Sequence, residues 1–234
     1  MSVLAIIPAG GSGIRFDGGN NPKQYQILAG KPVIINTLET ICKVKGITGI
    51  AVAVSESYLD YMKLIMSEYE ISKNVLLFTG GSSRQETIFN VIKSGILGEY
   101  EKVVIHDSVR PLATPNLFSR VIKELNDNDA VITGNKLKDT IKEHSGNDLI
   151  TLDREKIYSI QTPQGFRADL ITIAHFHALE TGYTGTDDAG LVEKLIADTK
   201  AGLKVKIIEG EERNIKITTE FDLELAEYIL NNRN

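Results

Sequence analysis

The stretch AIIPAGGSGIRFDGGNNPK, residues 5–23, decides how the rest of the chain is interpreted. It continues an apolar run that begins at Val3 and is short enough to be a buried strand, and Pro8 ends that run because proline donates no hydrogen bond to a sheet. The glycines that follow expose backbone N–H groups and let another molecule approach the backbone closely. With two cations, Arg15 and Lys23, this strand and turn predict a polyphosphate-binding loop.

Neither of two common phosphate loops fits this stretch. The dinucleotide fingerprint requires a third glycine where Phe16 stands, and the Walker A loop requires a lysine followed by Ser or Thr, whereas Lys31 is followed by Pro32. An ordinary strand–turn–helix connection would explain the glycines alone. It would explain neither Arg15 nor the triplet at residues 22–24, so we favour phosphate binding.

Composition and charge narrow the class of protein. The length of 234 residues fits one large or two small domains, and with 42% hydrophobic residues the chain can bury a substantial core. A net charge of −5 argues against a broad basic surface for nucleic acid. Cys42 is the only cysteine, so no disulfide forms within the chain. No segment resembles a signal peptide or a transmembrane span, so we expect a cytoplasmic protein that does not engage a membrane.

Strands alternate with helices along most of the chain, which predicts an α/β fold with a mostly parallel sheet covered by helices on both faces. Ligands of such sheets bind beyond the carboxyl ends of the strands. This rule brings residues 8–23, 80–87 and 106–110 to one edge. The alternating pattern at about 136–160 instead predicts a protruding β-arm, whose exposed edges a partner subunit can cover. Residues 161–166 fit no simple pattern.

Asp107 lies at the carboxyl end of the strand expected at residues 102–107. An aspartate at that edge, beside a phosphate loop, suits Mg²⁺ bound together with substrate phosphates. The alternative is an aspartate that caps the next turn and pairs with Arg110; the nearby loop favours the metal. We expect His106 to be a hydrogen-bonding structural residue rather than a base, since an anionic phosphate nucleophile needs no deprotonation.

Other polar segments are ambiguous from the residues alone. The glycine-bearing segment 80–84, with Thr87, either holds a base and ribose or is a turn whose serine caps a helix. Residues 186–188 most simply cap a helix. Lys216 projects from an alternating segment and either returns to the active edge or is a solvated surface lysine, and Arg154 has the same ambiguity.

Taken in order, these motifs resemble those of the 2-C-methyl-D-erythritol 4-phosphate cytidylyltransferases, a family related to the ribitol-5-phosphate cytidylyltransferases. The resemblance runs essentially end to end, and the ordered set is more specific than any one motif. It rests on Pro8–Arg15, Pro22–Tyr25, His106–Pro111, Asp139–Lys142, Asp153–Arg154, Gln161–Gln164, Thr186–Ala189 and Asn214–Thr219.

The resemblance implies a Rossmann-like nucleotidyltransferase fold in a single domain, residues 1–234, and a homodimer clasped by the arm. It implies that CTP and a polyol phosphate give a CDP-polyol and pyrophosphate with Mg²⁺. The implied catalytic residues are Arg15, Lys23, Arg154 and Lys216. The implied nucleotide contacts are Pro8, Ala9, Gly10, Gly11, Gly81, Ser82, Arg84, Thr87 and Ser108. The implied polyol phosphate contacts are Asp107, Arg110, Thr140, Arg154, Thr162 and Thr186, with Asp107 also on the metal and with Thr140 and Arg154 reaching into the partner's site.

One departure from the family bears on the polyol. Ser108-Val109 replaces the small pair common in the methylerythritol enzymes and matches the ribitol enzymes. The short link from Arg84 to His106 and the sequence Leu152-Asp153-Arg154 favour methylerythritol phosphate, so ribitol 5-phosphate is the alternative substrate.

A different class also has to be weighed, because related folds bind nucleotide sugars without this chemistry or act as glycosyltransferases. A glycosyltransferase would usually show a paired-acid metal motif where this chain has Asp107 alone. A binding protein without catalysis would have no reason to keep four implied catalytic cations together. We therefore expect a nucleotidyltransferase.

Overall fold

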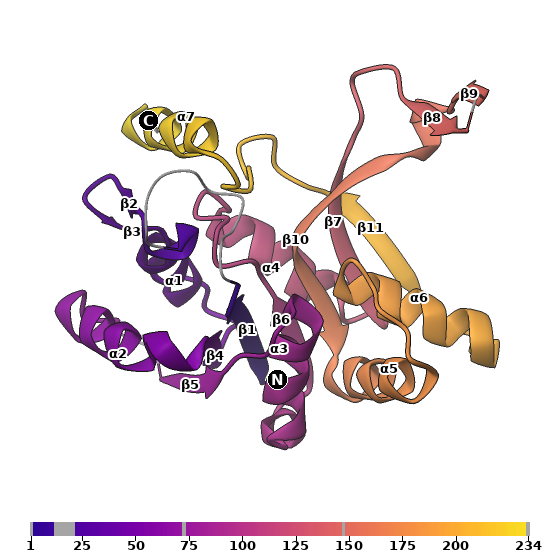
Figure 1. Ribbon diagram of the computed structural model, residues 1–234. Coiled ribbons are helices and arrows are strands. Elements are labelled where there is room, and N and C mark those ends of the chain that lie inside the picture. The colour runs from indigo at the N-terminus through magenta and orange to yellow at the C-terminus, as the bar shows by residue number, and fades with distance from the viewer. Residues whose placement is uncertain (1, 12–21, 72–73, 147, 233–234) are drawn as a thin grey trace.

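The computed structural model describes residues 2–11, 22–71, 74–146 and 148–232. Strands and helices alternate through most of it (Figure 1). The strands are β1 (Val3–Ala9), β2 (Ile27–Leu28), β3 (Lys31–Pro32), β4 (Gly49–Val54), β5 (Val75–Thr79), β6 (Lys102–Ile105), β7 (Ala130–Lys136), β8 (Lys142–Ser145), β9 (Asp148–Thr151), β10 (Tyr158–Arg167) and β11 (Val205–Glu209). The α-helices are α1 (Val33–Cys42), α2 (Leu59–Glu68), α3 (Arg84–Lys93), α4 (Pro115–Glu124), α5 (Ala168–Thr181), α6 (Asp188–Thr199) and α7 (Glu220–Asn231).

Seven strands form the central sheet in the order β11-β7-β10-β6-β1-β4-β5. Every neighbouring pair is parallel except the two that involve β10, which runs antiparallel to both β6 and β7. The carboxyl ends of β1, β4 and β6 therefore lie at one edge of the sheet, where the segments that follow them can meet.

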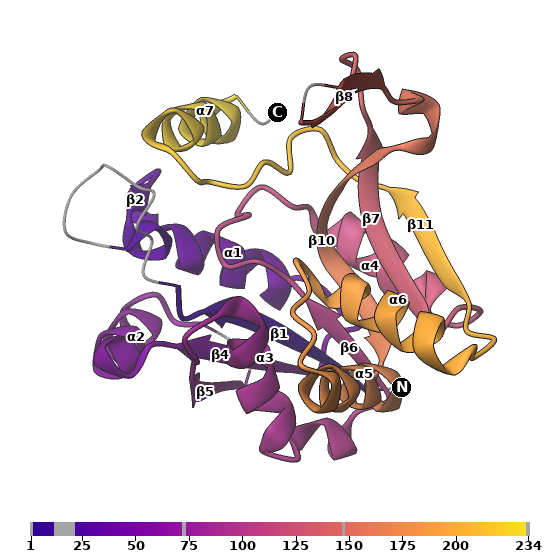
Figure 2. The same cartoon turned by 45° about the vertical axis from the view of Figure 1, so that its right-hand side comes forward.

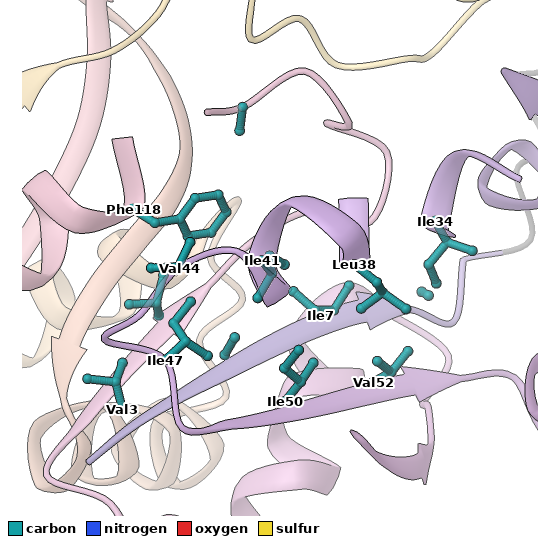
Figure 3. Close-up of a cluster of buried hydrophobic side chains, with 14 of the residues drawn as sticks. Val3, Ile7, Ile34, Leu38, Ile41, Val44, Ile47, Ile50, Val52 and Phe118 are labelled. Atoms are coloured by element: carbon teal, nitrogen blue, oxygen red, sulfur yellow. The ribbon is translucent and has the colours of Figure 1, made fainter. Parts of the chain in front are cut away.

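Helices cover both faces of this sheet, as Figure 2 shows for α1 and α4 on one side and α3 and α5 on the other. The alternation of β1 explains why both faces can be filled. Ala5 and Ile7 point into a cluster with α1, α2 and α4 (Figure 3), whereas Leu4 and Ile6 point into a cluster with α3, α5 and α6. All four side chains are fully buried, which explains why the sequence of β1 is a continuous apolar run.

Strand β10 contains residues 161–166, for which the sequence pattern predicted no secondary structure. A proline inside a run argues against a central strand because it removes a ladder hydrogen bond. The sheet accommodates Pro163 with a shift in the β10–β7 register between Gln161 and Gly165. Residues 161–166 are therefore the buried part of β10, which lies between β7 and β6 and runs antiparallel to both.

The predicted arm is present. Strands β8 and β9 form a separate antiparallel ribbon, which lies between the carboxyl end of β7 and the amino end of β10 in the chain and projects from the sheet there (Figure 1). Its strands are exposed throughout, including Leu149 and Ile150, which are 59% and 54% exposed. The arm thus leaves the apolar side chains of Leu149 and Ile150 uncovered within this chain.

The last part of the chain returns across the carboxyl edge of the sheet. Ile217 N–H donates to the Val109 carbonyl, and α7 packs on a small cluster that includes Leu28 and Val109. Thr219 and Asp222 cap α7 reciprocally, which fixes where the helix begins. In the described part of the chain, no helix is both long and apolar enough to cross a membrane.

Candidate active site

The three segments expected at one edge of the sheet do meet there, around a cavity that we call the edge cavity. Its lining comes from the loop after β1, the segment around Lys23, the start of α3, the loop after β6 and the returning segment before α7. The lining residues are Pro8, Ala9, Gly10, Gly11, Lys23, Gln24, Arg84, Thr87, Asp107, Ser108, Val109 and Lys216.

The first two loops touch backbone to backbone. A Cβ added to Gly80 would lie 3.3 Å from the Cα of Gly10, and one added to Gly10 would lie 3.0 Å from Thr87 Oγ1. Side chains at these positions would push the loops apart, which is a physical reason for glycine at both. Thr87 Oγ1 accepts from Gly81 N–H at 3.0 Å and donates to the Ser83 carbonyl at 2.8 Å, so it locks the second loop.

The second loop also caps α3. Ser83 accepts from Glu86 N–H at 3.1 Å, and Ser82 N–H donates to the Glu86 carboxylate at 2.7 Å. The cap interpretation of this segment is therefore correct. Gly81 and Ser82 are not among the residues that line the edge cavity, and their nucleotide contacts stay a prediction.

Asp107 is the centre of charge in the edge cavity. Its carboxylate lies 3.1 Å from Arg84 Nε, 3.5 Å from Arg110 Nε and 2.9 Å from Lys216 Nζ. Burial alone would raise the pKa of Asp107, but Arg84, Lys216 and Arg110 together hold that pKa well below its usual range. The pairing of Asp107 with Arg110 is therefore present, and it is one of three.

Arg84 connects this cluster to a second buried carboxylate. Its Nη1 lies 2.7 Å from Asp188 Oδ2, and the other oxygen of Asp188 lies 3.4 Å from His175 Nε2. Asp188 and His175 are each 1% exposed. Burial opposes the charge of Asp188, but Arg84 and then His175 lower its pKa. Sequence reasoning treated residues 186–188 as a helix cap, which is correct for Asp187, and missed the buried role of Asp188.

Thr162 is engaged inside the protein. Its hydroxyl accepts from Asp107 N–H at 3.0 Å and lies 3.1 Å from His106 Nδ1, to which it donates because the other nitrogen of the neutral ring is the donor to a carbonyl. His106 Nε2 then donates to the Arg110 carbonyl at 3.1 Å. Burial lowers the pKa of His106 to about 4, so the ring is neutral and structural, as expected. The hydroxyl of Thr162 thus uses its donor and one of its two acceptor sites inside the protein, and its contact with the polyol stays a prediction.

Lys216 reaches the edge cavity because Asn214 anchors the returning segment. The buried Asn214 side chain donates to Gln161 Oε1 at 3.2 Å and to the Thr162 carbonyl at 2.8 Å, and Arg110 Nη1 donates to the Asn214 carbonyl at 2.8 Å. The segment is extended without joining the sheet. Of the two interpretations of Lys216, the return to the active edge is correct.

Among the described residues, seven predicted site residues do not line the edge cavity of their own chain: Gly81, Ser82, Arg110, Thr140, Arg154, Thr162 and Thr186. Arg15 lies outside the described residues. Thr140 and Arg154 belong to the arm, where Arg154 Nη1 donates to the Lys138 carbonyl at 2.7 Å. Thr186 is exposed just before α6. The arm residues would need the site of another subunit to act as predicted.

The edge cavity fits a magnesium ion that arrives with a nucleotide rather than a preformed metal cage. No group of three His, Cys, Asp or Glu side chains is placed to hold a metal among the residues that the structure describes. Asp107 is the one carboxylate in the described lining. Magnesium is often held by one or two carboxylates together with substrate phosphate oxygens and water, so a single aspartate is compatible with such a site.

Comparison with known proteins shows the family of this chain. Residues 3–232 match the family described as IspD, 2-C-methyl-D-erythritol 4-phosphate cytidylyltransferase. The chain belongs to this family. A relative of that name from Syntrophus aciditrophicus is 41% identical over 97% of this chain and 95% of its own length, and one from Geobacillus kaustophilus is 38% identical over 100% and 99%.

Solved structures of IspD proteins also match. The 4-diphosphocytidyl-2C-methyl-D-erythritol synthase of Anaerococcus prevotii superposes with a TM-score of 0.86 at 33% identity, covering 98% of this chain and 96% of that one. The cytidylyltransferase of Thermus thermophilus gives a TM-score of 0.75 at 27% identity, covering 99% and 100%. The expected α/β nucleotidyltransferase fold and the family resemblance are thereby confirmed.

Proposed function

We propose that this protein joins CTP and 2-C-methyl-D-erythritol 4-phosphate to form CDP-methylerythritol and pyrophosphate. The observation that carries the proposal is the cluster of three cations around Asp107, which opens into the edge cavity beside Lys23 and the glycine loops. Two of its members, Arg84 and Lys216, line the cavity itself. Such a cluster retains net positive charge and suits two phosphate-bearing substrates.

The reaction asks for positioning and charge stabilisation more than for covalent chemistry. A phosphate oxygen of the polyol attacks the α-phosphorus of CTP, the bond to the β,γ-diphosphate breaks, and pyrophosphate carries away the negative charge. Lys23, together with Arg15, is assigned to the charge that builds at the α-phosphate. The backbone of residues 8–11 and the residues Gly81, Ser82, Arg84, Thr87 and Ser108 are assigned to the nucleotide.

The polyol phosphate is assigned to the part of the edge cavity that Asp107 and Lys216 line. Lys216 and Arg110 supply positive charge there, and Asp107 and Thr162 hold these two groups in place. Thr186 is also assigned to the polyol phosphate. A magnesium ion shared between Asp107 and the nucleotide phosphates would neutralise charge on the transferred group and on the leaving pyrophosphate.

Thr140 and Arg154 are assigned to the site of a partner subunit, in a homodimer held by the arms. Two features of the arm support this assignment: its strands have uncovered edges, and its apolar side chains Leu149 and Ile150 are exposed. The use of CTP, a nucleoside triphosphate of cell metabolism, favours a cytoplasmic location, which cell fractionation would test.

Ribitol 5-phosphate is the alternative polyol because of Ser108-Val109. The names of the relatives compared above favour methylerythritol phosphate. Pyrophosphate release with CTP and Mg²⁺, measured in parallel on the two polyol phosphates, decides between them. Turnover of methylerythritol phosphate alone supports the proposal, and turnover of ribitol phosphate alone replaces the substrate while keeping the chemistry. Absence of turnover with both contradicts cytidylyl transfer to either polyol.

A further inference from the structure

Gln24 stands between the glycine loop and the lysine assigned to the α-phosphate. It is 4% exposed, it lines the edge cavity, and it follows Lys23 directly. Its side-chain nitrogen donates to the Ala9 carbonyl at 2.7 Å and to the Gly11 carbonyl at 3.1 Å. One amide group thus bonds two carbonyls that are two residues apart, and because both partners are acceptors, the orientation of the amide is fixed.

These two bonds set the direction of the loop's own donors. In a trans peptide the C=O of one residue and the N–H of the next point in opposite directions. Because the Ala9 carbonyl faces Gln24, the Gly10 N–H faces away from it. A loop whose carbonyls turned toward the ligand would instead present negative dipoles to a polyphosphate.

The segment that carries Gln24 is itself anchored. Tyr25, which is 2% exposed, stacks on Tyr58 with ring centroids 4.7 Å apart and an interplanar angle of 13°. Tyr61 packs on its edge at 5.3 Å. This cluster, formed with residues from the start of α2, holds the short helical turn Lys23–Tyr25 against the body of the protein.

We propose that Gln24 is a positioning residue, which holds the loop of residues 9–11 so that its N–H groups face the triphosphate and stay in register with Lys23. The inference rests on the proposed use of CTP, and it assigns to Gln24 no contact with the reacting atoms. Two sets of contacts hold the loop: Gln24 bonds the carbonyls of Ala9 and Gly11, and Gly10 packs closely against Gly80 and Thr87.

Two substitutions separate the hydrogen bonds of Gln24 from its shape. Gln24→Glu keeps the shape but places acceptors against two carbonyls, and Gln24→Met removes the donors without adding charge. We expect the KM for CTP and the Kd of CTP measured by calorimetry to rise about tenfold or more for Met, and further for Glu, as the loss of buried hydrogen bonds predicts. The KM for the polyol phosphate at saturating CTP should stay within about twofold.

Asn36 offers a matched control. Its side-chain nitrogen also donates to backbone carbonyls, those of Leu28 and Pro32, at 3.1 and 3.3 Å, but it lies on α1 and outside the edge cavity. Asn36→Asp should lower the Tm without changing the Kd of CTP. Equal weakening by Asn36→Asp and Gln24→Met would reduce Gln24 to a general stabilising residue, and unchanged CTP binding in both Gln24 variants would overturn the proposal.

The wild-type protein supplies a measurement that needs no variant to fold. On titration with CTP, the amide resonance of Gly10 should shift, whereas the side-chain amide of Asn36 should not. A Gly10 amide that is unaffected at saturation would contradict the proposal. Because binding of CTP is read directly, a failure to turn over methylerythritol phosphate would count against the proposed substrate and leave the role of Gln24 open to the same test.

Discussion

Lys216 Nζ lies 2.9 Å from Asp107 Oδ2, although the two residues are 109 positions apart in the chain. The contact is possible because the segment before α7 crosses the carboxyl edge of the sheet beside the loop that follows β6. Lys216 is 39% exposed on its side chain, whereas Asp107 is 9% exposed. The lysine is therefore the member of the cluster best placed to turn from the carboxylate toward an arriving phosphate.

Removing the charge of Asp107 should destabilise the fold. In Asp107→Asn, Arg84 and Arg110 keep their positive charges in a largely buried cluster but lose their shared carboxylate. Breaking a buried pair from one side costs about 3–5 kcal/mol, and we expect a decrease of that order in the free energy of unfolding. Urea denaturation measures it. Asp60→Asn, which removes the exposed pair with Lys63, is the control and should change little.

The neutral state of His106 predicts a pH dependence of stability. Its pKa is about 4 in the folded protein against 6.5 for the free group, because the ring is fully buried. Between these values the unfolded chain binds the additional proton, so the free energy of unfolding rises with pH. As the pH falls from about 6.5 to about 4, this one group should remove about 3 kcal/mol.

The variant His106→Gln tests this assignment, since glutamine keeps a donor and an acceptor but does not titrate. Its stability should vary less with pH than that of the wild type between pH 4 and 6.5. Identical pH slopes for the two proteins would show that His106 does not supply the dependence. The other histidines are common to both proteins and cancel in the comparison.

The sequence predicted which segments meet because the rule for parallel sheets needs only the order of strands and helices. The loops after β1 and β6 and the start of α3 followed from that rule, and the edge cavity gathers residues from all three. The family motifs then pointed to Lys216, whose return to the site depends on where a long segment crosses the sheet. Periodicity alone left that lysine ambiguous.

The features that the sequence did not predict are those that depend on three-dimensional distance. The Arg84–Asp188 pair joins the starts of two helices far apart in the chain, and a helix cap explained the local pattern of residues 186–188 equally well. The register shift that admits Pro163 into β10 has no local signal either. Gln24 belongs to the triplet at residues 22–24, but its hydrogen-bond partners are backbone carbonyls. Because every residue has a carbonyl, no sequence pattern identifies these partners.

Loss of the Lys23 ammonium should impair the chemical step. We expect Lys23→Ala to reduce kcat by about 10²-fold or more, because a preorganised donor to the charge that develops at the α-phosphate is removed. Single-turnover measurement of pyrophosphate release gives the rate directly. Lys63→Ala, which removes an exposed lysine of α2, should retain wild-type kcat. A Lys23→Ala enzyme with an unchanged rate would disprove the assignment of this residue.

The proposed sharing of sites between subunits can be tested by complementation. Lys216 lines the cavity of its own chain, whereas Arg154 lies on the arm. Arg154→Ala and Lys216→Ala should each be nearly inactive as homodimers. In a mixed dimer, one site would combine an intact cavity with an intact arm, and the other would carry both defects.

Random mixing of these two variants should therefore restore about a quarter of wild-type activity, since half of the dimers in a twofold-symmetric assembly are mixed and half of their sites are intact. The control mixes Arg154→Ala with Thr140→Ala. Both of these changes lie on the arm, so every site receives a defective arm and no activity returns. Mixtures of Arg154→Ala and Lys216→Ala that show only the sum of the separate activities would mean that the arm does not serve a partner's site.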